Sequence, residues 1–146
     1  MTNTIELPNA RHPEDGILSG GQLTPDALRA AAEAGYATIL NLRDPNEMTF
    51  DEAGLVEELG MTYVSLPISG PFDLTAARAY SFDAALRDAE RPMIVHCGSG
   101  NRVGALFALR ATFCKGASVA DALVLGREAG LTGMEPAVRD VLIRSA

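Results

Sequence analysis

Apolar residues along this chain fall into short continuous runs and into longer stretches with helical spacing. Continuous runs are typical of parallel strands covered on both faces. They predict strands at Tyr36–Leu42, Thr62–Leu66 and Met93–His96, with a short edge strand at Ile17–Ser19. Helical spacing predicts helices over residues 24–35, 51–59, 75–90, 103–115, 118–129 and 135–143. Residues 1–16, which mix prolines, asparagines and charges, are expected to form an irregular entry segment.

The order of these elements predicts the fold class. Strands that alternate with helices form a mostly parallel sheet, because each right-handed crossover places a helix on one face. We therefore expect a three-layer α/β fold with four to five strands and helices on both faces. A chain of 146 residues is the size of one domain, so residues 1–146 are expected to form a single unit.

Composition and charge narrow the possible partners. The formal net charge is −7, which disfavours nucleic-acid binding because that function needs a basic face. Charges or prolines interrupt every apolar run before it reaches the length of a membrane span, so no membrane partner is expected. The first residues do not have the pattern of a secretion signal, and two cysteines are too few for a disulfide scaffold. A cytoplasmic location is the expectation, and the oligomeric state is left open.

The chemistry of the sequence is concentrated where the strand Met93–His96 ends in a cysteine. Cys97 is followed by a loop broken by Gly98 and Gly100, and then by Arg102. Glycines let consecutive N–H groups turn inward, and such a nest at a helix N-terminus binds phosphate-like anions. The same positive environment favours the thiolate, the nucleophilic form of cysteine. Arginine adds a planar fork for an oxyanion, so we interpret Cys97 as a reactive thiol.

With this loop between a strand and a buried helix, the chain resembles the cysteine-dependent phosphatase superfamily of tyrosine and dual-specificity type. The signature segment is His96-Cys97-Gly98-Ser99-Gly100-Asn101-Arg102. The chain is similar in particular to a small bacterial branch, the phosphatase-like domain of β-lactamase-hydrolase-like proteins. Weaker matches to that branch lie at residues 19–25, 38–43 and 63–68.

The resemblance implies a phosphatase-like fold and hydrolysis of phosphate monoesters without a metal or another cofactor. Cys97 would attack phosphorus and form a phosphocysteine, which water then cleaves. The phosphate-binding P-loop would comprise Gly98, Ser99, Gly100, Asn101 and Arg102. The implied ligand is a phosphorylated protein or small molecule, or free phosphate or sulfate.

Other residues receive supporting roles from the resemblance and from their position. His96 would support the loop from behind the thiol. Asp73 lies on a loop 24 residues before Cys97 and is the candidate general acid, although an aspartate there also suits a helix N-cap. Asp44, on the loop after the strand Tyr36–Leu42, is the alternative acid.

Two departures from the superfamily pattern keep other functions open. Four residues separate Cys97 from Arg102, where five are usual; rhodanese-type sulfurtransferases also have four, and their loop holds a persulfide on the cysteine. The next residue, Val103, has no hydroxyl to support the thiolate as a leaving group. The alternatives are therefore sulfur transfer through a Cys97 persulfide and a phosphate-binding module without turnover.

The remaining reactive side chains are expected to be structural. Cys114 follows Cys97 by most of a helix, which places the two too far apart for a disulfide. Arg43 and Glu47 have the spacing of a surface charge pair, although Arg43 could face the site. His12 has no partner pattern, so no metal site is expected.

Overall fold

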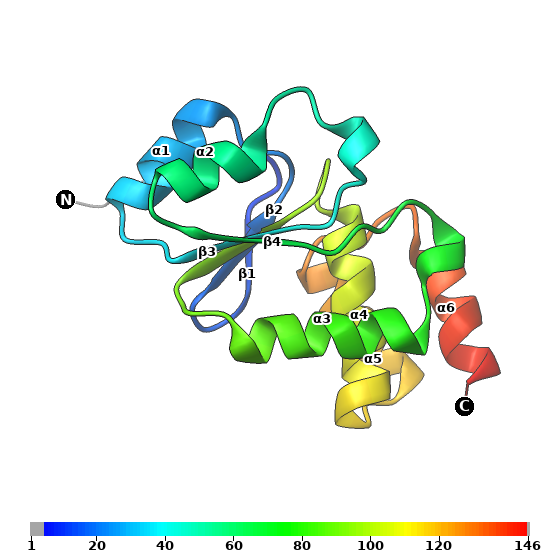
Figure 1. Cartoon of the computed structure of the whole chain (residues 1–146). Coiled ribbons are helices and arrows are strands. Elements are labelled where there is room, and N and C mark those ends of the chain that lie inside the picture. Colours follow the sequence, from blue (N-terminus) through cyan, green and yellow to red (C-terminus); the bar gives the residue numbers. More distant parts are fainter. Residues whose placement is uncertain (1–4, 146) are drawn as a thin grey trace.

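A computed structural model describes residues 5–145 and shows a five-stranded sheet between two layers of helices (Figure 1). The strands are β1 Arg11–Glu14, β2 Ile17–Gly20, β3 Thr38–Asn41, β4 Thr62–Ser65 and β5 Met93–His96. The helices are α1 Pro25–Glu33, α2 Glu52–Glu58, α3 Ala76–Asp88, α4 Asn101–Lys115, α5 Val119–Glu128 and α6 Glu135–Arg144. Single-turn 3₁₀ helices are η1 Pro45–Glu47 and η2 Pro71–Asp73.

The sheet has the order β1-β2-β5-β3-β4, and only the β1–β2 pair is antiparallel. Side chains on β5 alternate between the two faces, as the pleat requires. Met93 and Val95 pack with the cluster formed with α3, α4, α5 and α6, whereas Ile94 packs with α1 and α2. The three-layer, mostly parallel α/β fold predicted from the sequence is confirmed, with α1 and α2 on one face and the other four helices opposite (Figure 1).

Helix α4 is the centre of the lower helical layer. All residues from Val103 to Ala111 are buried, as its continuous apolar sequence predicts. The helix packs against both α3 and α5. A Cβ at Gly104 would collide with the backbone of Leu131, so the connection between α5 and α6 crosses α4 where α4 has no side chain. This packing fixes the start of α4, and with it the loop that precedes the helix.

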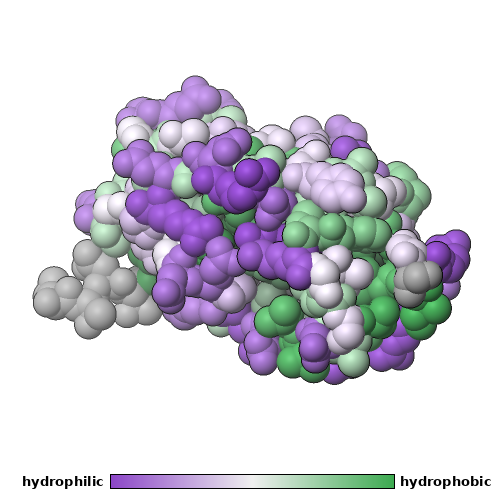
Figure 2. All heavy atoms as spheres, turned by 90° about the horizontal axis from the view of Figure 1, so that it is seen from below, coloured by the Kyte–Doolittle hydropathy of each residue, from purple (hydrophilic) through white to green (hydrophobic). Residues whose placement is uncertain are grey.

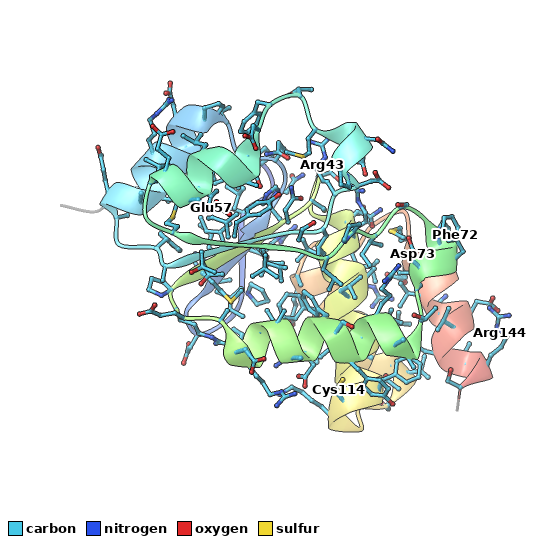
Figure 3. All side chains as sticks on the ribbon, viewed as in Figure 1. Arg43, Glu57, Phe72, Asp73, Cys114 and Arg144 are labelled. Carbon is cyan, nitrogen blue, oxygen red and sulfur yellow. The ribbon has the colours of Figure 1, made fainter. Side chains whose placement is uncertain are left out.

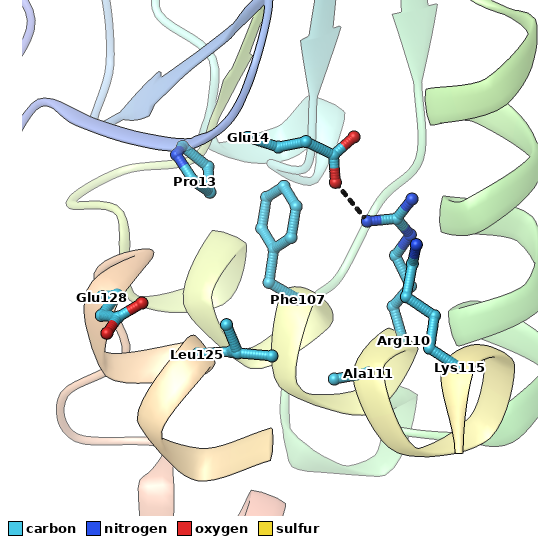
Figure 4. A pocket seen from close by; sticks show the side chains of 8 residues that line it. All are labelled: Pro13, Glu14, Phe107, Arg110, Ala111, Lys115, Leu125 and Glu128. Carbon is cyan, nitrogen blue, oxygen red and sulfur yellow. Dashed lines mark hydrogen bonds and ion pairs between the residues drawn. The ribbon is translucent and has the colours of Figure 1, made fainter. Parts of the chain in front are cut away.

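The prediction that residues 1–16 are irregular is wrong over part of that segment. Strand β1 lies within it, and Ile5 and Leu7 are buried; residues 1–4, like residue 146 of the predicted domain, lie outside the described residues. Glu14 of β1 accepts a hydrogen bond of 2.8 Å from Arg110 of α4, at the edge of a small hollow (Figure 4). Local pattern misses this strand because its residues are polar and include a proline, which is characteristic of sheet edges.

The prediction of an edge position for Ile17–Ser19 is also wrong. Strand β2 lies between β1 and β5 and is fully buried. The edges of the sheet are β1 and β4. An interior position gives β2 a second role, because its end at Gly20 lies beside the end of β5.

Helix caps follow local sequence rules. Thr24 accepts the Ala27 N–H at the start of α1, and Ser118 caps α5 in the same way. Helix α3 is capped by Thr75 rather than Asp73, which frees the Asp73 carboxylate for other contacts.

The lower face of the molecule is mixed in polarity. Figure 2 shows hydrophilic atoms over much of this face and hydrophobic atoms gathered toward the end formed by α5 and α6. Exposed apolar side chains of these two helices are Val124, Leu125 and Ile143. Within residues 5–145, no helix combines the length and apolar character needed to cross a membrane.

Candidate active site

The candidate site lies at the carboxyl end of β5, the central strand of the sheet. The Cys97 N–H donates to the Gly20 carbonyl over 3.1 Å, and the His96 carbonyl accepts from the Leu42 N–H over 2.9 Å. Strands β2 and β3 therefore continue to hold the chain one residue past β5. Parallel strands place their carboxyl ends at one edge, where open α/β sheets bind ligands. Cys97 is thus fixed at a predictable point by backbone bonds alone.

The loop after Cys97 turns the Gly100 N–H toward the thiol. The Gly98 carbonyl accepts the Gln22 N–H over 3.1 Å, and the Ser99 carbonyl accepts from the Asn9 side chain over 2.8 Å. In a trans peptide the N–H points away from the carbonyl, so the Gly100 N–H points to the side opposite the Ser99 carbonyl. The Gly100 N–H accordingly lies 3.0 Å from Cys97 Sγ. Gly100 has φ of +99°, a conformation that glycine adopts readily.

Arg102 is held by Glu47 with one edge of its guanidinium still available. Its Nη1 and Nη2 donate to the two carboxylate oxygens of Glu47 over 2.7 and 2.9 Å, and Nη1 also donates to the Ile68 carbonyl over 3.1 Å. An arginine has five N–H groups. Three are used in these bonds, which leaves Nε–H and one Nη2–H, the pair that can grip an oxyanion from the side. The guanidinium lowers the pKa of Glu47 to about 2.

The predicted charge pair of Arg43 and Glu47 is present, with 3.5 Å between Arg43 Nε and Glu47 Oε1, but it is not an ordinary surface pair. Glu47 also orients Arg102 across 55 residues of sequence, and Arg43 donates to the Glu47 carbonyl over 3.0 Å. Both residues come from the connection between β3 and α2. The i, i+4 spacing of Arg43 and Glu47 in the sequence did not indicate that the Glu47 carboxylate would reach the loop.

His96 is fully buried behind Cys97, with both ring nitrogens facing hydrogen-bond acceptors. Nδ1 lies 3.2 Å from the Cys97 carbonyl, and Nε2 lies 2.7 Å from Glu52 Oε2. These two contacts hold the imidazole ring in one orientation. The supporting role of His96 stays a prediction, and the structure places its ring at the Cys97 carbonyl. Glu52 was not predicted, because a glutamate in the first turn of a helix normally suits the macrodipole at the surface.

Asp73 and Asp44 both bind Ser69, which lines the hollow beside the loop. Asp73 accepts the Ser69 N–H over 2.7 Å, and Asp44 accepts the Ser69 hydroxyl over 2.7 Å. The backbone N–H of Ser69 is the main cause that lowers the pKa of Asp73, and Arg78 adds to it. The N–H of Asn46 is the main cause that lowers the pKa of Asp44. In the free protein both carboxyl groups are therefore held in the ionised form.

The hollow is lined by residues from four parts of the chain: Glu47, Ser69, Gly70, Pro71, Ser99, Asn101, Arg102 and Met134. Three of the predicted loop residues contribute to it. Cys97 does not, because its side chain is fully buried beneath the loop. The Asn101 side chain accepts the N–H groups of Thr132 and Met134, so it ties the loop to the start of α6.

Two further side chains, Phe72 and Cys114, differ in their distance from this hollow. Phe72 of η2, beside Asp73, is 77% exposed (Figure 3). Cys114 lies near the opposite end of α4, and both cysteines are free (Figure 3). Burial raises the pKa of the Cys114 thiol, which disfavours its nucleophilic thiolate form. Among residues 5–145, no three His, Cys, Asp or Glu side chains gather as a metal site.

A cysteine at the end of the central parallel strand, a glycine loop and an arginine in the first turn of the next helix define a phosphatase-like α/β domain. The chain belongs to one family of such domains: the model described as "Beta-lactamase hydrolase-like protein, phosphatase-like domain" matches residues 14–114. A curated relative is the Beta-lactamase hydrolase-like protein of Xylella fastidiosa, 34% identical over 94 residues, which cover 61% of this chain. The aligned part spans only 22% of that relative's length.

Solved structures share the fold. A putative phosphatase from Neisseria meningitidis superposes with a TM-score of 0.75 at 21% identity, covering 93% of this chain and 97% of that chain. The core catalytic domain of the PP-IP phosphatase SIW14 from S. cerevisiae, solved with citrate, superposes with a TM-score of 0.70 at 18% identity. The coverage is 95% of this chain and 88% of that chain. The recognition of the phosphatase-like class from the sequence is confirmed.

Proposed function

We propose that this protein hydrolyses phosphate monoesters with Cys97 as the nucleophile. One observation carries the proposal: the Gly100 N–H lies 3.0 Å from the Cys97 sulfur, and Arg102, in the first turn of the helix that follows, keeps one edge of its guanidinium available. Hydrogen-bond donors placed in this way stabilise the charge that develops on the phosphate oxygens during transfer. The order of strand, loop and helix around Cys97 supports the assignment of this protein to the phosphatases of tyrosine or dual-specificity type. A working thiolate suits a reducing compartment such as the cytoplasm.

The reaction has two steps. In the first, the Cys97 thiolate attacks phosphorus, an S–P bond forms and the P–O bond to the leaving group breaks, while an acid protonates the leaving oxygen. In the second, water attacks phosphorus, the S–P bond breaks, and the water proton returns to the acid. Inorganic phosphate and the thiolate result. Gly98, Ser99, Gly100, Asn101 and Arg102 would hold the phosphate through backbone N–H groups and the guanidinium.

Asp73 is proposed as the acid, with Asp44 as the alternative. Both carboxylates converge on Ser69 at the hollow, so a leaving group there would lie beside either one. The hydrogen bonds that lower their pKa values oppose this role in the free protein. A dianionic phosphate ester placed next to the carboxylate raises its pKa by like-charge repulsion, which would supply the proton on binding.

Sulfur transfer through a Cys97 persulfide is the second candidate. It is favoured by the four-residue loop and by the complete burial of the sulfur, because a tight cradle suits one additional sulfur atom better than a phosphoryl group. The absence of a hydroxyl at Val103 also disfavours rapid cleavage of a phosphocysteine. A phosphate reaching the thiol would require the glycine loop to open slightly.

Hydrolysis of 4-nitrophenyl phosphate, measured beside transfer of sulfur from thiosulfate to cyanide, tests both candidates. Wild type, Cys97→Ser and the control Cys114→Ser are compared. We expect phosphate release that is lost in Cys97→Ser and kept in Cys114→Ser. Thiocyanate formation without phosphate release would overturn hydrolysis in favour of sulfur transfer. Phosphate binding with neither activity would indicate a binding module.

A further inference from the structure

A continuous line of polar side chains connects the two sides of the candidate site. We call it the polar chain, and its members are His96, Glu52, Gln22, Arg43, Glu47 and Arg102. Gln22 Nε2 donates to Glu52 Oε1 over 2.6 Å, and Gln22 Oε1 accepts from Arg43 Nη1 over 2.9 Å. One end reaches the carbonyl of the nucleophilic residue through His96, and the other end is the oxyanion-binding arginine.

Glu52 stands out because its carboxylate is buried in α2, with 2% of the residue exposed. Burying a carboxylate costs several kcal/mol unless its oxygens are well occupied. Both oxygens are occupied here, Oε2 by His96 and Oε1 by Gln22. An apolar side chain would fill this position between helix and sheet without that cost. The burial therefore points to a role other than packing.

Every hydrogen bond around Gln22 has one possible direction. Arg43 can only donate and the Leu23 carbonyl can only accept, so the Gln22 amide presents its oxygen to Arg43 and its NH₂ to the Leu23 carbonyl and Glu52. The backbone N–H of the same residue donates to the Gly98 carbonyl in the loop. Gln22 thus links the loop, the buried carboxylate and the arginine that holds Glu47.

We propose that Gln22 and Glu52 are positioning residues of the oxyanion site, which act by aligning Arg102 and His96, the residue whose ring contacts the Cys97 carbonyl. The inference deepens the proposed function and rests on it for the nature of the ligand. A chain of directed bonds between rigid elements keeps the available edge of Arg102 aimed at the loop before the ligand arrives. Preorganised donors of this kind bind an oxyanion without a cost of reorientation.

Exchanging the carboxylate and the amide between these two positions tests the direction of the bonds while keeping the shape of the side chains. Gln22→Glu puts a carboxylate oxygen against Glu52 Oε1, so that two acceptors of like charge face each other. Adding Glu52→Gln restores the order of donors and acceptors between positions 52, 22 and 43, and only the bond of 2.9 Å from Gln22 Nε2 to the Leu23 carbonyl stays lost. The new amide at position 52 accepts from His96 and donates to the new carboxylate at position 22, which still accepts from Arg43. The swap therefore predicts rescue, which a role in packing alone does not.

The measurement is the dissociation constant of inorganic sulfate at pH 7 by isothermal titration calorimetry. We expect Gln22→Glu to weaken binding about tenfold or more, and the double swap to return within about threefold of wild type. Glu57→Gln is the control, since it makes the same chemical change at an exposed position of α2 (Figure 3) and should leave affinity unchanged. Equal affinity of wild type and Gln22→Glu, or a swap no better than the single variant, would overturn the proposal.

Folding of each variant is checked by circular dichroism. If Gln22→Glu does not fold, Gln22→Met replaces it, because methionine keeps the length of the side chain and the backbone N–H but removes the amide. Gln22→Met should also weaken sulfate binding about tenfold. Unchanged sulfate binding in this variant would overturn the proposal. Sulfate binding involves no turnover. A wild type that binds sulfate but releases no phosphate therefore overturns hydrolysis alone, whereas one that binds no sulfate overturns the oxyanion site and this inference together.

Discussion

The ion pair between Glu47 and Arg102 should contribute measurably to folding as well as to the site, and Glu47→Gln is the change that tests it. Glutamine keeps the shape of the side chain and removes its charge. Arg102 is then left with 18% of its side chain exposed and without the two charge-assisted bonds it now makes. The substitution therefore removes the attraction and leaves a partly buried cation unpaired.

The magnitude follows from the pKa of Glu47, which falls from an ordinary value of 4.5 to about 2 chiefly because of Arg102, with smaller contributions from the Asp44 N–H and Arg43. A difference of about 2.5 units corresponds to about 3.4 kcal/mol if solvent did not screen the pair. One third of the Glu47 side chain is exposed, at 33%, so screening reduces this value. We expect Glu47→Gln to lower the free energy of unfolding by about 1–2 kcal/mol at pH 7.

The pH dependence has a definite sign. Because the pKa of Glu47 is depressed in the folded state, its contribution is fully present above about pH 4.5 and is lost as the pH falls toward 2. Urea denaturation at pH 7, 5 and 3 should therefore show the same difference between wild type and variant at the two higher values and less than half of it at pH 3.

Glu135→Gln is the matched control for geometry. Glu135 also makes two bonds to one arginine, at 2.7 Å each, but Arg127 has 49% of its side chain exposed. Glu135→Gln should therefore lower the free energy of unfolding much less than Glu47→Gln does. If Glu47→Gln costs no more than Glu135→Gln, or if the difference persists unchanged at pH 3, the reasoning from burial and charge is refuted.

Three other substitutions give distinct outcomes. Arg102→Lys should weaken sulfate binding more than tenfold because an ammonium cannot replace two parallel N–H groups; calorimetry giving an unchanged constant would contradict this. Asp73→Asn should slow the hydrolysis of aryl phosphates with poor leaving groups far more than the hydrolysis of those with good leaving groups. If Asp73→Asn slows both equally and Asp44→Asn slows the poor leaving groups selectively, the acid is Asp44. Gly104→Ala should lower the free energy of unfolding by about 3 kcal/mol or more, because the new Cβ would collide with the backbone of Leu131. The control Gly116→Ala has free space but a φ of +69°, so it should lower that free energy by only about 1–2 kcal/mol. Similar losses for the two variants in urea denaturation would argue against the tight crossing at α4.

Part of the site is encoded locally. The apolar run of β5, the glycines after it and the start of the helix that follows lie within about ten residues of sequence and depend on one another. Chain conformation there depends on strand pairing and on the freedom of glycine, both of which follow from residue type. Cys97, Arg102 and the position of His96 could be predicted for this reason, and the α/β class followed from the order of strands and helices.

The residues that hold the site were not predictable in the same way. Glu52, Gln22 and Glu47 reach the loop across separations of 44, 76 and 55 residues, Gln22 through its backbone N–H. Each has a sequence context that suits a surface position, because a glutamate in the first turn of a helix or beside an arginine is ordinary there. Strand β1 was missed on similar grounds, since a polar edge strand has no periodic apolar signal.

The sequence by itself determined where the thiol, the loop and the arginine lie relative to the sheet, because short-range backbone preferences decide those positions. Only the tertiary structure decided which carboxylates orient them, that Thr75 rather than Asp73 caps α3, and that Asp73 and Asp44 share Ser69. Hydrogen bonds between side chains depend on how crossovers bring distant segments together. That information resides in the packing of the whole core and not in any one stretch of the chain.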